Sequence, residues 1–168
     1  MKIARPARRS SAFLGFAAGT VLALCAFAAC SASERPRDPF ADYARARVTI
    51  QSSSGSHTLS VWIADTPARR MQGLMFVRTL APDAGMIFFF ENPRYVSMWM
   101  KNTYVALDML FIDAQGRIVN IARDARPLSL ETINSAAPIS AVLELAAGAA
   151  ERMSVQAGDQ VSYAQLRP

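Results

Sequence analysis

The polar residues best placed to do chemistry form a short cluster between apolar stretches, Lys101-Asn102-Thr103 followed by Asp108. An ammonium, an amide, a hydroxyl and a carboxylate together suit a small polar or anionic ligand. Lys101 would supply charge, Asn102 and Thr103 would orient the ligand, and Asp108 would accept hydrogen bonds. The alternative is structural: Asn102 makes a left-handed turn, while Thr103 and Asp108 satisfy backbone groups.

Two further charged residues are candidates for the same ligand-binding site. Arg70 falls in a predicted short helix, and Glu144 stands between two leucines in an apolar segment. A carboxylate in such a segment is expected to point to solvent, or to be paired if it is buried. Pairing of Glu144 with Arg70 or with Lys101 is therefore one arrangement of the site.

Methionine offers a second kind of site. Met98 and Met100 flank Trp99, and the alternation of side chains along a strand places both thioethers on one face. Thioethers bind Cu(I), so a copper site at Met98 and Met100 is an alternative to the polar site. Methionine also fills irregular cores, and packing is the simpler interpretation of this cluster.

No catalytic motif is present in the sequence. Both cysteines, Cys25 and Cys30, precede the expected domain, and His57 is the only histidine. The domain therefore lacks a Cys–His pair, and the sequence has no Gly-x-Ser-x-Gly elbow, phosphate loop or His-Glu-x-x-His helix. We expect a non-catalytic protein with no cofactor.

The N-terminal segment is typical of an export signal. Residues 1–10 are basic, and residues 11–29 are uncharged and apolar with small residues at the end. Phe27-Ala28-Ala29-Cys30 resembles the lipobox of bacterial lipoproteins, which predicts lipidation of Cys30 and a membrane anchor. Ser31 after the cysteine favours the outer membrane. Ordinary cleavage after Ala28 would instead release a periplasmic protein, and an uncleaved segment would remain as a membrane helix.

Charge is concentrated at the start of the chain. Of 18 basic residues, four precede the apolar segment, which leaves 14 basic and 13 acidic residues beyond residue 30. A domain this close to neutral has no electrostatic surface for nucleic acid. We assign residues 1–29 to a signal peptide, 30–45 to a polar tether and 46–166 to a single domain.

The domain shows short apolar runs separated by turn residues, which is typical of antiparallel β structure. Strands are expected at 47–51, 57–64, 85–91, 95–100, 107–113, 117–122, 141–145 and 160–165. Short helices are expected from Asp65-Thr66-Pro67 to Gly73 and over 148–153. The predicted fold class is mainly β: an antiparallel sandwich-like or partly closed barrel domain with two short helices.

Several blocks together carry a family resemblance. They are Gly73-Leu74-Met75, Gly85-Met86, Trp99-Met100-Lys101-Asn102-Thr103, Leu107-Asp108 and Val142-Leu143-Glu144-Leu145. Over about residues 47–165 the chain resembles the domain of unknown function 192 (DUF 192) family. The resemblance implies a mainly β, sandwich-like domain and no known reaction. The family often has an arginine two residues after the methionine of Gly-Leu-Met, where this chain has Val77.

These observations predict an exported, lipid-anchored protein of the cell envelope. Its domain is expected to be a non-catalytic module that binds a small polar or anionic ligand or an envelope component. A periplasmic Cu(I)-binding protein and a structural or protein-partner domain are the alternatives.

Overall fold

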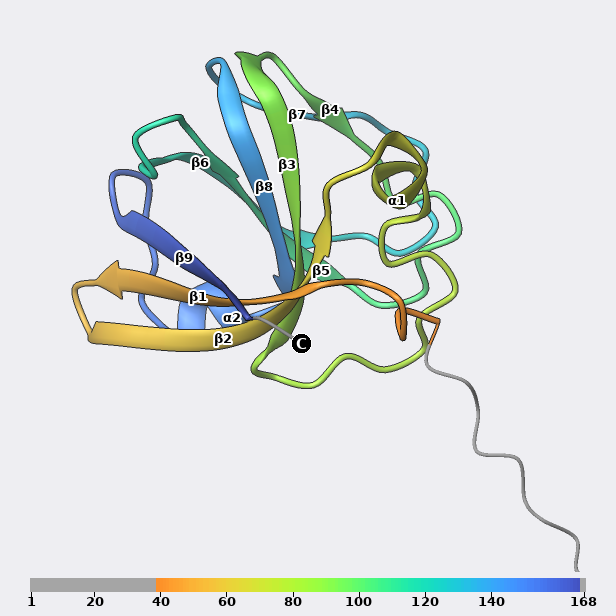
Figure 1. The fold of residues 1–168 in the computed structure, drawn as a ribbon, viewed down its shortest axis with the longest axis horizontal. Coiled ribbons are helices and arrows are strands. Elements are labelled where there is room, and N and C mark those ends of the chain that lie inside the picture. The colour runs from red at the N-terminus through yellow and green to blue at the C-terminus, as the bar shows by residue number, and fades with distance from the viewer. Residues whose placement is uncertain (1–38, 167–168) are drawn as a thin grey trace, which may run out of the picture. The chain divides into compact units, whose positions relative to one another are not determined.

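A seven-stranded sheet dominates the fold of the computed structural model, which describes residues 39–166 (Figure 1). The sheet order is β6-β5-β8-β3-β2-β1-β9, and a separate two-stranded sheet joins β4 to β7. The strands are β1 (Arg45–Ser52), β2 (Gly55–Ala64), β3 (Ala84–Arg94), β4 (Ser97–Met98), β5 (Leu107–Ile112), β6 (Ile118–Ala125), β7 (Ile133–Asn134), β8 (Ile139–Ala146) and β9 (Gln160–Leu166). The helices are α1 (Pro67–Gln72) and α2 (Ala149–Arg152).

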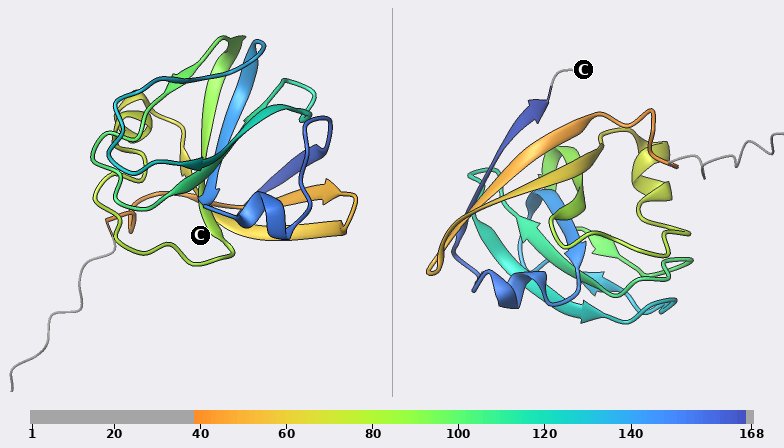
Figure 2. Two further views of the ribbon diagram at one scale, coloured as in Figure 1. Left: turned by 180° about the vertical axis from the view of Figure 1, so that it is seen from behind. Right: turned by 90° about the horizontal axis from the view of Figure 1, so that it is seen from below.

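The large sheet curls into a half-barrel that closes at one end. Neighbouring strands are antiparallel except β2 and β3, which are parallel and are connected through α1. At the closed end Arg117 and Gln160 form an isolated antiparallel β-bridge. The Val161 N–H also donates to the Gly116 carbonyl oxygen at 2.7 Å. Figure 2 shows β9 and the β5–β6 hairpin approaching each other there. The predicted partly closed, mainly β domain with two short helices is confirmed.

Local sequence signals explain how the elements begin and end. The Thr66 hydroxyl accepts a hydrogen bond from the Arg69 N–H at 3.2 Å, Pro67 opens α1, and Gly73 ends it with φ of 47°. In the β5–β6 hairpin, the Asp113 carboxylate accepts bonds from two backbone N–H groups of the turn. Gly116 there adopts φ of 81°, a conformation that glycine reaches without strain.

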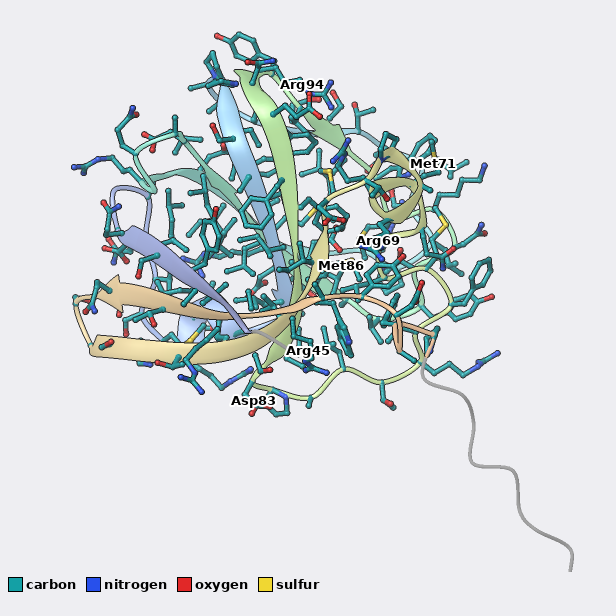
Figure 3. All side chains as sticks on the ribbon, viewed as in Figure 1. Arg45, Arg69, Met71, Asp83, Met86 and Arg94 are labelled. Carbon is teal, nitrogen blue, oxygen red and sulfur yellow. The ribbon has the colours of Figure 1, made fainter. Side chains whose placement is uncertain are left out.

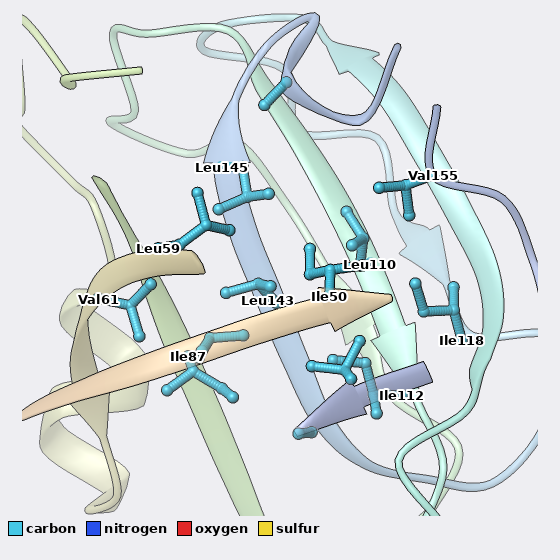
Figure 4. Close-up of a cluster of buried hydrophobic side chains, with 14 of the residues drawn as sticks. Ile50, Leu59, Val61, Ile87, Leu110, Ile112, Ile118, Leu143, Leu145 and Val155 are labelled. Carbon is cyan, nitrogen blue, oxygen red and sulfur yellow. The ribbon is translucent and has the colours of Figure 1, made fainter. Parts of the chain in front are cut away.

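The inner face of the curled sheet holds an apolar core. Side chains from β1, β2, β3, β5, β6 and β8 meet there and are closed off by α2 and Val155. Figure 4 shows this cluster, with Ile50 and Val61 facing Leu110 and Leu143 across the half-barrel. Alternate residues of the strands point inward, which is the period-2 pattern expected of a half-barrel wall.

The outer face of the sheet is also apolar and needs a separate cover. Met86, Phe88, Met109, Phe111 and Val142 on β3, β5 and β8 are buried on this side. The cover consists of α1, the β4–β7 sheet and the loops between these elements. It contributes the buried side chains Leu74, Val96 and Met100. The central strands are therefore buried on both faces, as the continuous apolar runs at 85–91 and 141–145 indicate.

Two sequence predictions need correction here. The domain begins earlier than residue 46, because Phe40 is buried in the outer core and its ring packs against Trp62 and Tyr43. The expected strand over 95–100 shrinks to the two residues of β4, because the backbone turns away after Met98. The predicted signal peptide and Cys30 lie outside the described residues. Within residues 39–166 no helix has the length and apolarity to cross a membrane.

Candidate functional site

A cavity of about 490 Å³ lies between the outer face of the sheet and its cover. This volume falls within the range of small-molecule sites, roughly 300–1,000 Å³. Its apolar walls come from Leu74, Phe88, Phe90, Val96 and Trp99. Arg70, Lys101, Thr103 and Glu144, four of the six residues predicted as a ligand site, line this one cavity. The structure thus brings together residues that lie up to 74 positions apart in the chain.

Glu144 lies at the sheet side of the cavity, with Met86 and Met109 as its neighbours on the flanking strands. The residue is only 4% exposed, and the one ion pair within residues 39–166 does not include it. Burial raises the pKa of its carboxyl from 4.5 to about 8. The described residues therefore contain neither the Arg70–Glu144 nor the Lys101–Glu144 ion pair, and the neutral acid avoids the cost of an unpaired charge.

Arg70 is held in position by the backbone. Its Nη1 donates to the carbonyl oxygens of Asp65 and Phe89 at 2.7 and 2.9 Å. The guanidinium also lies 5.7 Å from the centre of the Phe90 ring. Two carbonyl bonds from different parts of the chain fix the side chain before any ligand arrives. The remaining N–H groups of Arg70 keep their capacity to donate.

Two more cations line the cavity at exposed positions. The Lys101 ammonium lies 5.5 Å from the centre of the Trp99 ring, and the Arg94 guanidinium lies 4.8 Å from that of Phe90. Figure 3 shows Arg94 at the far end of β3 and Met71 on α1. Across residues 39–166 the one ion pair joins Arg69 to Asp65, so none of the three cavity cations is neutralised by a carboxylate.

The other predicted residues have structural roles. Asn102 adopts φ of 57° and its carbonyl accepts the Phe76 N–H at 2.8 Å, which is the left-handed turn of the structural alternative. Asp108 is 1% exposed and points to the inner face, opposite to Glu144. Its two carboxylate oxygens accept the N–H groups of Asp124 and Ala150, each at 2.9 Å. Asp108 thereby ties α2 and β6 to β5.

The methionines divide between the cavity and the core. Met98 lines the cavity, together with Met71 and Met75, whereas Met100 is fully buried in the outer core. Met98 and Met100 therefore do not share an accessible face, because β4 ends at Met98. In residues 39–166 no group of three or more histidine, cysteine or acidic side chains is arranged to hold a metal ion.

Sequence reasoning missed Arg94 and the aromatic walls of the site. Phe88 and Phe90 share the parity of Met86 on β3, so their common face could have been recognised from the alternation. Arg94 has the same parity and lines the same cavity, although the register between β3 and β8 shifts between Phe89 and Arg94. The alternation along β3 would therefore have included it.

Comparison with known proteins identifies the family. The sequence profile of DUF192, described as Uncharacterized ACR, matches residues 48–163. The chain belongs to this family. Its profile spans the cavity walls from α1 to β8, so the resemblance noted from the sequence is confirmed. A search of curated proteins finds no match to the chain.

Two solved structures are similar to this DUF192 domain. A candidate transcription regulator from Sinorhizobium meliloti 1021 is 48% identical, with a TM-score of 0.70, and the match covers 72% of this chain and 95% of that one. A protein of unknown function from Novosphingobium aromaticivorans DSM 12444 is 34% identical, with a TM-score of 0.72, covering 78% and 94%. The matched domain accounts for nearly all of each of these two solved chains.

The structural role of Asp108 generates a stability prediction. Asp108→Ala leaves two N–H groups without their acceptor in a buried place, and we expect a loss of about 2–5 kcal/mol of unfolding free energy. Asp113→Ala is the matched control, since that carboxylate also accepts two N–H groups but in a turn that water can reach. Urea unfolding of both variants measures the difference. Equal losses of unfolding free energy in the two variants would contradict the role of Asp108 in connecting α2 and β6 to β5.

Glu144 generates a prediction about pH. The folded protein keeps the Glu144 proton up to about pH 8, whereas the unfolded chain releases it near 4.5, so the unfolding free energy decreases as pH rises across this interval. Glu144→Gln has no proton to release. Its stability relative to the native protein should increase with pH by up to about 1.4 kcal/mol per unit. Urea unfolding between these pH values measures the difference in unfolding free energy between the variant and the native protein. Glu131→Gln, at an exposed position, is the control. Parallel profiles would contradict a neutral Glu144.

Proposed function

We propose that the protein is an exported, lipid-anchored cell-envelope module that binds a small anionic ligand with an apolar part and catalyses no reaction. One observation carries the ligand class: Arg70, Arg94 and Lys101 line a single cavity without a carboxylate partner. The sole acid among the lining residues, Glu144, is held neutral by burial at neutral pH. The cavity is therefore positively charged, and the ligand that complements it is an anion.

The walls support an amphipathic ligand rather than a bare ion. Phe88, Leu74 and Val96 are buried side chains that face the cavity, and Phe90 and Trp99 add aromatic surface. An apolar body a few carbons long would displace water from these walls, at about 0.8 kcal/mol per buried methylene. Neutral Glu144 and the Thr103 hydroxyl would donate to oxygen atoms of the ligand. A cationic ligand offers donors and not acceptors, so it would not receive these hydrogen bonds.

The location rests on the sequence of residues 1–30. A basic start, an uncharged apolar segment and Cys30 in a lipobox-like context support export and lipidation. A ligand met outside the cytoplasm would then be a component of the envelope or a small organic anion that passes through it. The description of the Sinorhizobium relative as a transcription regulator applies to that protein. Residues 39–166 here carry 11 basic and 11 acidic side chains, which does not favour binding to nucleic acid.

A series of probes with one apolar chain and different head groups tests the ligand class. We expect hexanoate and hexyl phosphate to raise the unfolding temperature of residues 39–168, whereas hexylamine and hexanol do so weakly or not at all. Lys101→Ala should lower the affinity for both anions about tenfold, since one charge-assisted contact is lost. Arg47→Ala is the control, because Arg47 is an exposed cation on β1 away from the cavity.

The same series has a pH signature. Ionisation of Glu144 above about pH 8 adds a negative charge to the cavity, so binding of hexanoate should weaken there in the native protein. Glu144→Gln should bind hexanoate equally on both sides of that pH. Equal stabilisation by hexylamine and hexanoate, or no stabilisation by any probe, would rule out the anion site.

Copper binding is the second candidate, because the thioethers of Met71, Met75 and Met98 line the same cavity. Three thioethers form a soft ligand set that suits Cu(I). On this hypothesis a Met71→Leu/Met98→Leu variant loses Cu(I) in competition with a chromophoric chelator, while Lys101→Ala and Met153→Leu retain it. Met153 serves as the control because it packs against the inner core. Retention of Cu(I) by the double variant would exclude the thioether site.

A further inference from the structure

Exposed apolar side chains gather around the mouth of the cavity. Of the eight large apolar residues that are exposed within residues 39–166, seven lie in three segments of the cover. They are Met71, Phe76, Tyr95, Trp99, Tyr104, Leu128 and Leu130, and we name this set the rim. The eighth, Tyr163, lies on β9 and packs against Phe89. Soluble domains rarely collect exposed apolar side chains in one place without a binding role.

Contacts within the cover connect the residues of the rim. Met71, Tyr95 and Trp99 line one cavity. The Phe76 ring meets the Tyr104 ring edge to face with centroids 6.1 Å apart.

The segment that follows β6 joins the same surface through the backbone. The Leu128 N–H donates to the Thr103 carbonyl at 3.1 Å, and the Met100 N–H donates to the Ser129 carbonyl at 3.1 Å. The rim therefore spans α1 and its following loop, the 95–104 segment and the loop at 126–131.

Backbone strain keeps two rim residues exposed. Phe76 and Leu128 adopt φ of 67° and 62°, the left-handed region that bulky side chains avoid. Each is nonetheless 56% exposed, so burial in the domain does not compensate for the unfavourable backbone. Strain of this kind persists where the surroundings impose it and is concentrated at functional surfaces. Contact with a partner would supply the burial that the domain itself does not provide.

The charge around the rim favours an anionic partner. The segments 70–78, 94–104 and 126–131 carry five basic residues and one acidic residue. The rest of residues 39–166 carries six basic and ten acidic residues. The Arg78 guanidinium lies 5.0 Å from the Tyr104 ring centre, so cations and aromatic rings alternate on this surface. Tryptophan and tyrosine mixed with basic residues is the composition of surfaces that rest at a membrane interface.

The described chain begins next to the rim. The Arg69 Nη2 donates to the Asp42 carbonyl at 3.0 Å, and the Arg69 guanidinium lies over the Tyr43 ring. Residues 39–43 therefore lie against α1, the helix that carries Met71, as the second view in Figure 2 shows. Eight residues separate Cys30 from Pro39, a reach of at most about 30 Å. A lipid on Cys30 would keep this side of the domain close to the bilayer.

We propose that the rim docks on an anionic phospholipid surface. Trp99, Tyr104, Phe76, Leu128 and Leu130 enter the headgroup layer, and Lys101, Arg78 and Arg126 contact phosphate groups. The inference rests on the proposed location at the envelope and not on a ligand in the cavity. Docking on the membrane would also turn the cavity mouth toward the lipid surface.

Vesicle binding of residues 39–168, with thermal unfolding to confirm that the domain is folded, tests this proposal. The vesicles contain equal parts of phosphatidylethanolamine and phosphatidylglycerol, with phosphatidylcholine vesicles for comparison. We expect binding to the anionic vesicles and much weaker binding to the neutral ones, with a strong decrease at high salt. In a Trp62→Phe background, fluorescence of Trp99 should shift to the blue as its ring leaves water.

Matched variants separate the rim from exposed apolar surface in general. Leu128→Ser/Leu130→Ser should lower binding to the anionic vesicles at least roughly tenfold, because two buried side chains are lost. Tyr163→Ser removes an exposed ring outside the rim and should bind as the native domain does. Arg78→Glu/Arg126→Glu should weaken binding to the anionic vesicles alone. Thermal unfolding of each variant confirms that it is folded.

Three outcomes would overturn the proposal. One is unchanged vesicle binding in the leucine double variant, and another is equal binding to anionic and neutral vesicles. The third is no vesicle binding together with self-association that the double variant loses, which would assign the rim to a second copy of the chain. Hexanoate binding, measured in parallel, keeps the two proposals apart. The leucine double variant should bind hexanoate as the native domain does. Lys101→Ala should bind hexanoate about tenfold more weakly while still binding vesicles more strongly than the leucine variant.

Discussion

The structure depends on the burial of its central strands on both faces. β5 and β8 lie inside the seven-stranded sheet, and their side chains are buried in both directions. The sheet can hide its inner face by curling, because the strands then pack across the half-barrel. Curling leaves the outer face convex, so a second layer must come from α1, the short β4–β7 sheet and loops. The candidate site exists because this irregular layer covers the outer face incompletely.

The position of Glu144 follows from the same constraint. Its neighbours on the sheet are Met86 and Met109, so no partner is available at the floor of the cavity. The carboxyl is thus neutral at neutral pH, and its pKa is raised to about 8. Cations reach the cavity from the cover, where Lys101 is exposed and Arg70 is fixed by two carbonyl oxygens. A neutral floor beneath a cationic wall is the basis for proposing that the cavity binds an anion.

The inward and outward side chains of the cover have different surroundings. Its inward side chains, such as Leu74 and Met100, complete the outer core. Its segments are too short to form a regular layer, and they turn through left-handed residues that include Asn102 and Phe76. Outward side chains of these turns have no further layer to pack against, and they make the rim. The cavity wall and the rim are therefore inner and outer surfaces of the same few segments.

By itself the sequence determined the local structure of this protein. Alternating apolar runs predicted the strands, Thr66-Pro67 and Gly73 predicted the limits of α1, and the Asp113–Gly116 turn predicted a hairpin. These features depend on residues a few positions apart, so their physical causes are visible in the chain. The motif around Trp99 was sufficient to indicate the family. Lys101, Thr103, Arg70 and Glu144 were selected as charged or polar residues in apolar surroundings, and that criterion is also local.

Only the tertiary structure decided which of these residues share a site. Asp108 and Glu144 look alike in the sequence, but the pairing of Asp108 with Leu145 places the two carboxyls on opposite faces of the sheet. The register between β3 and β8 shifts before Arg94, and Phe40 joins the core from what reads as a polar tether. Strand order, register and burial arise from contacts between distant segments. For that reason no spacing along the chain shows whether a carboxyl ties a helix to the sheet or stands neutral in a cavity.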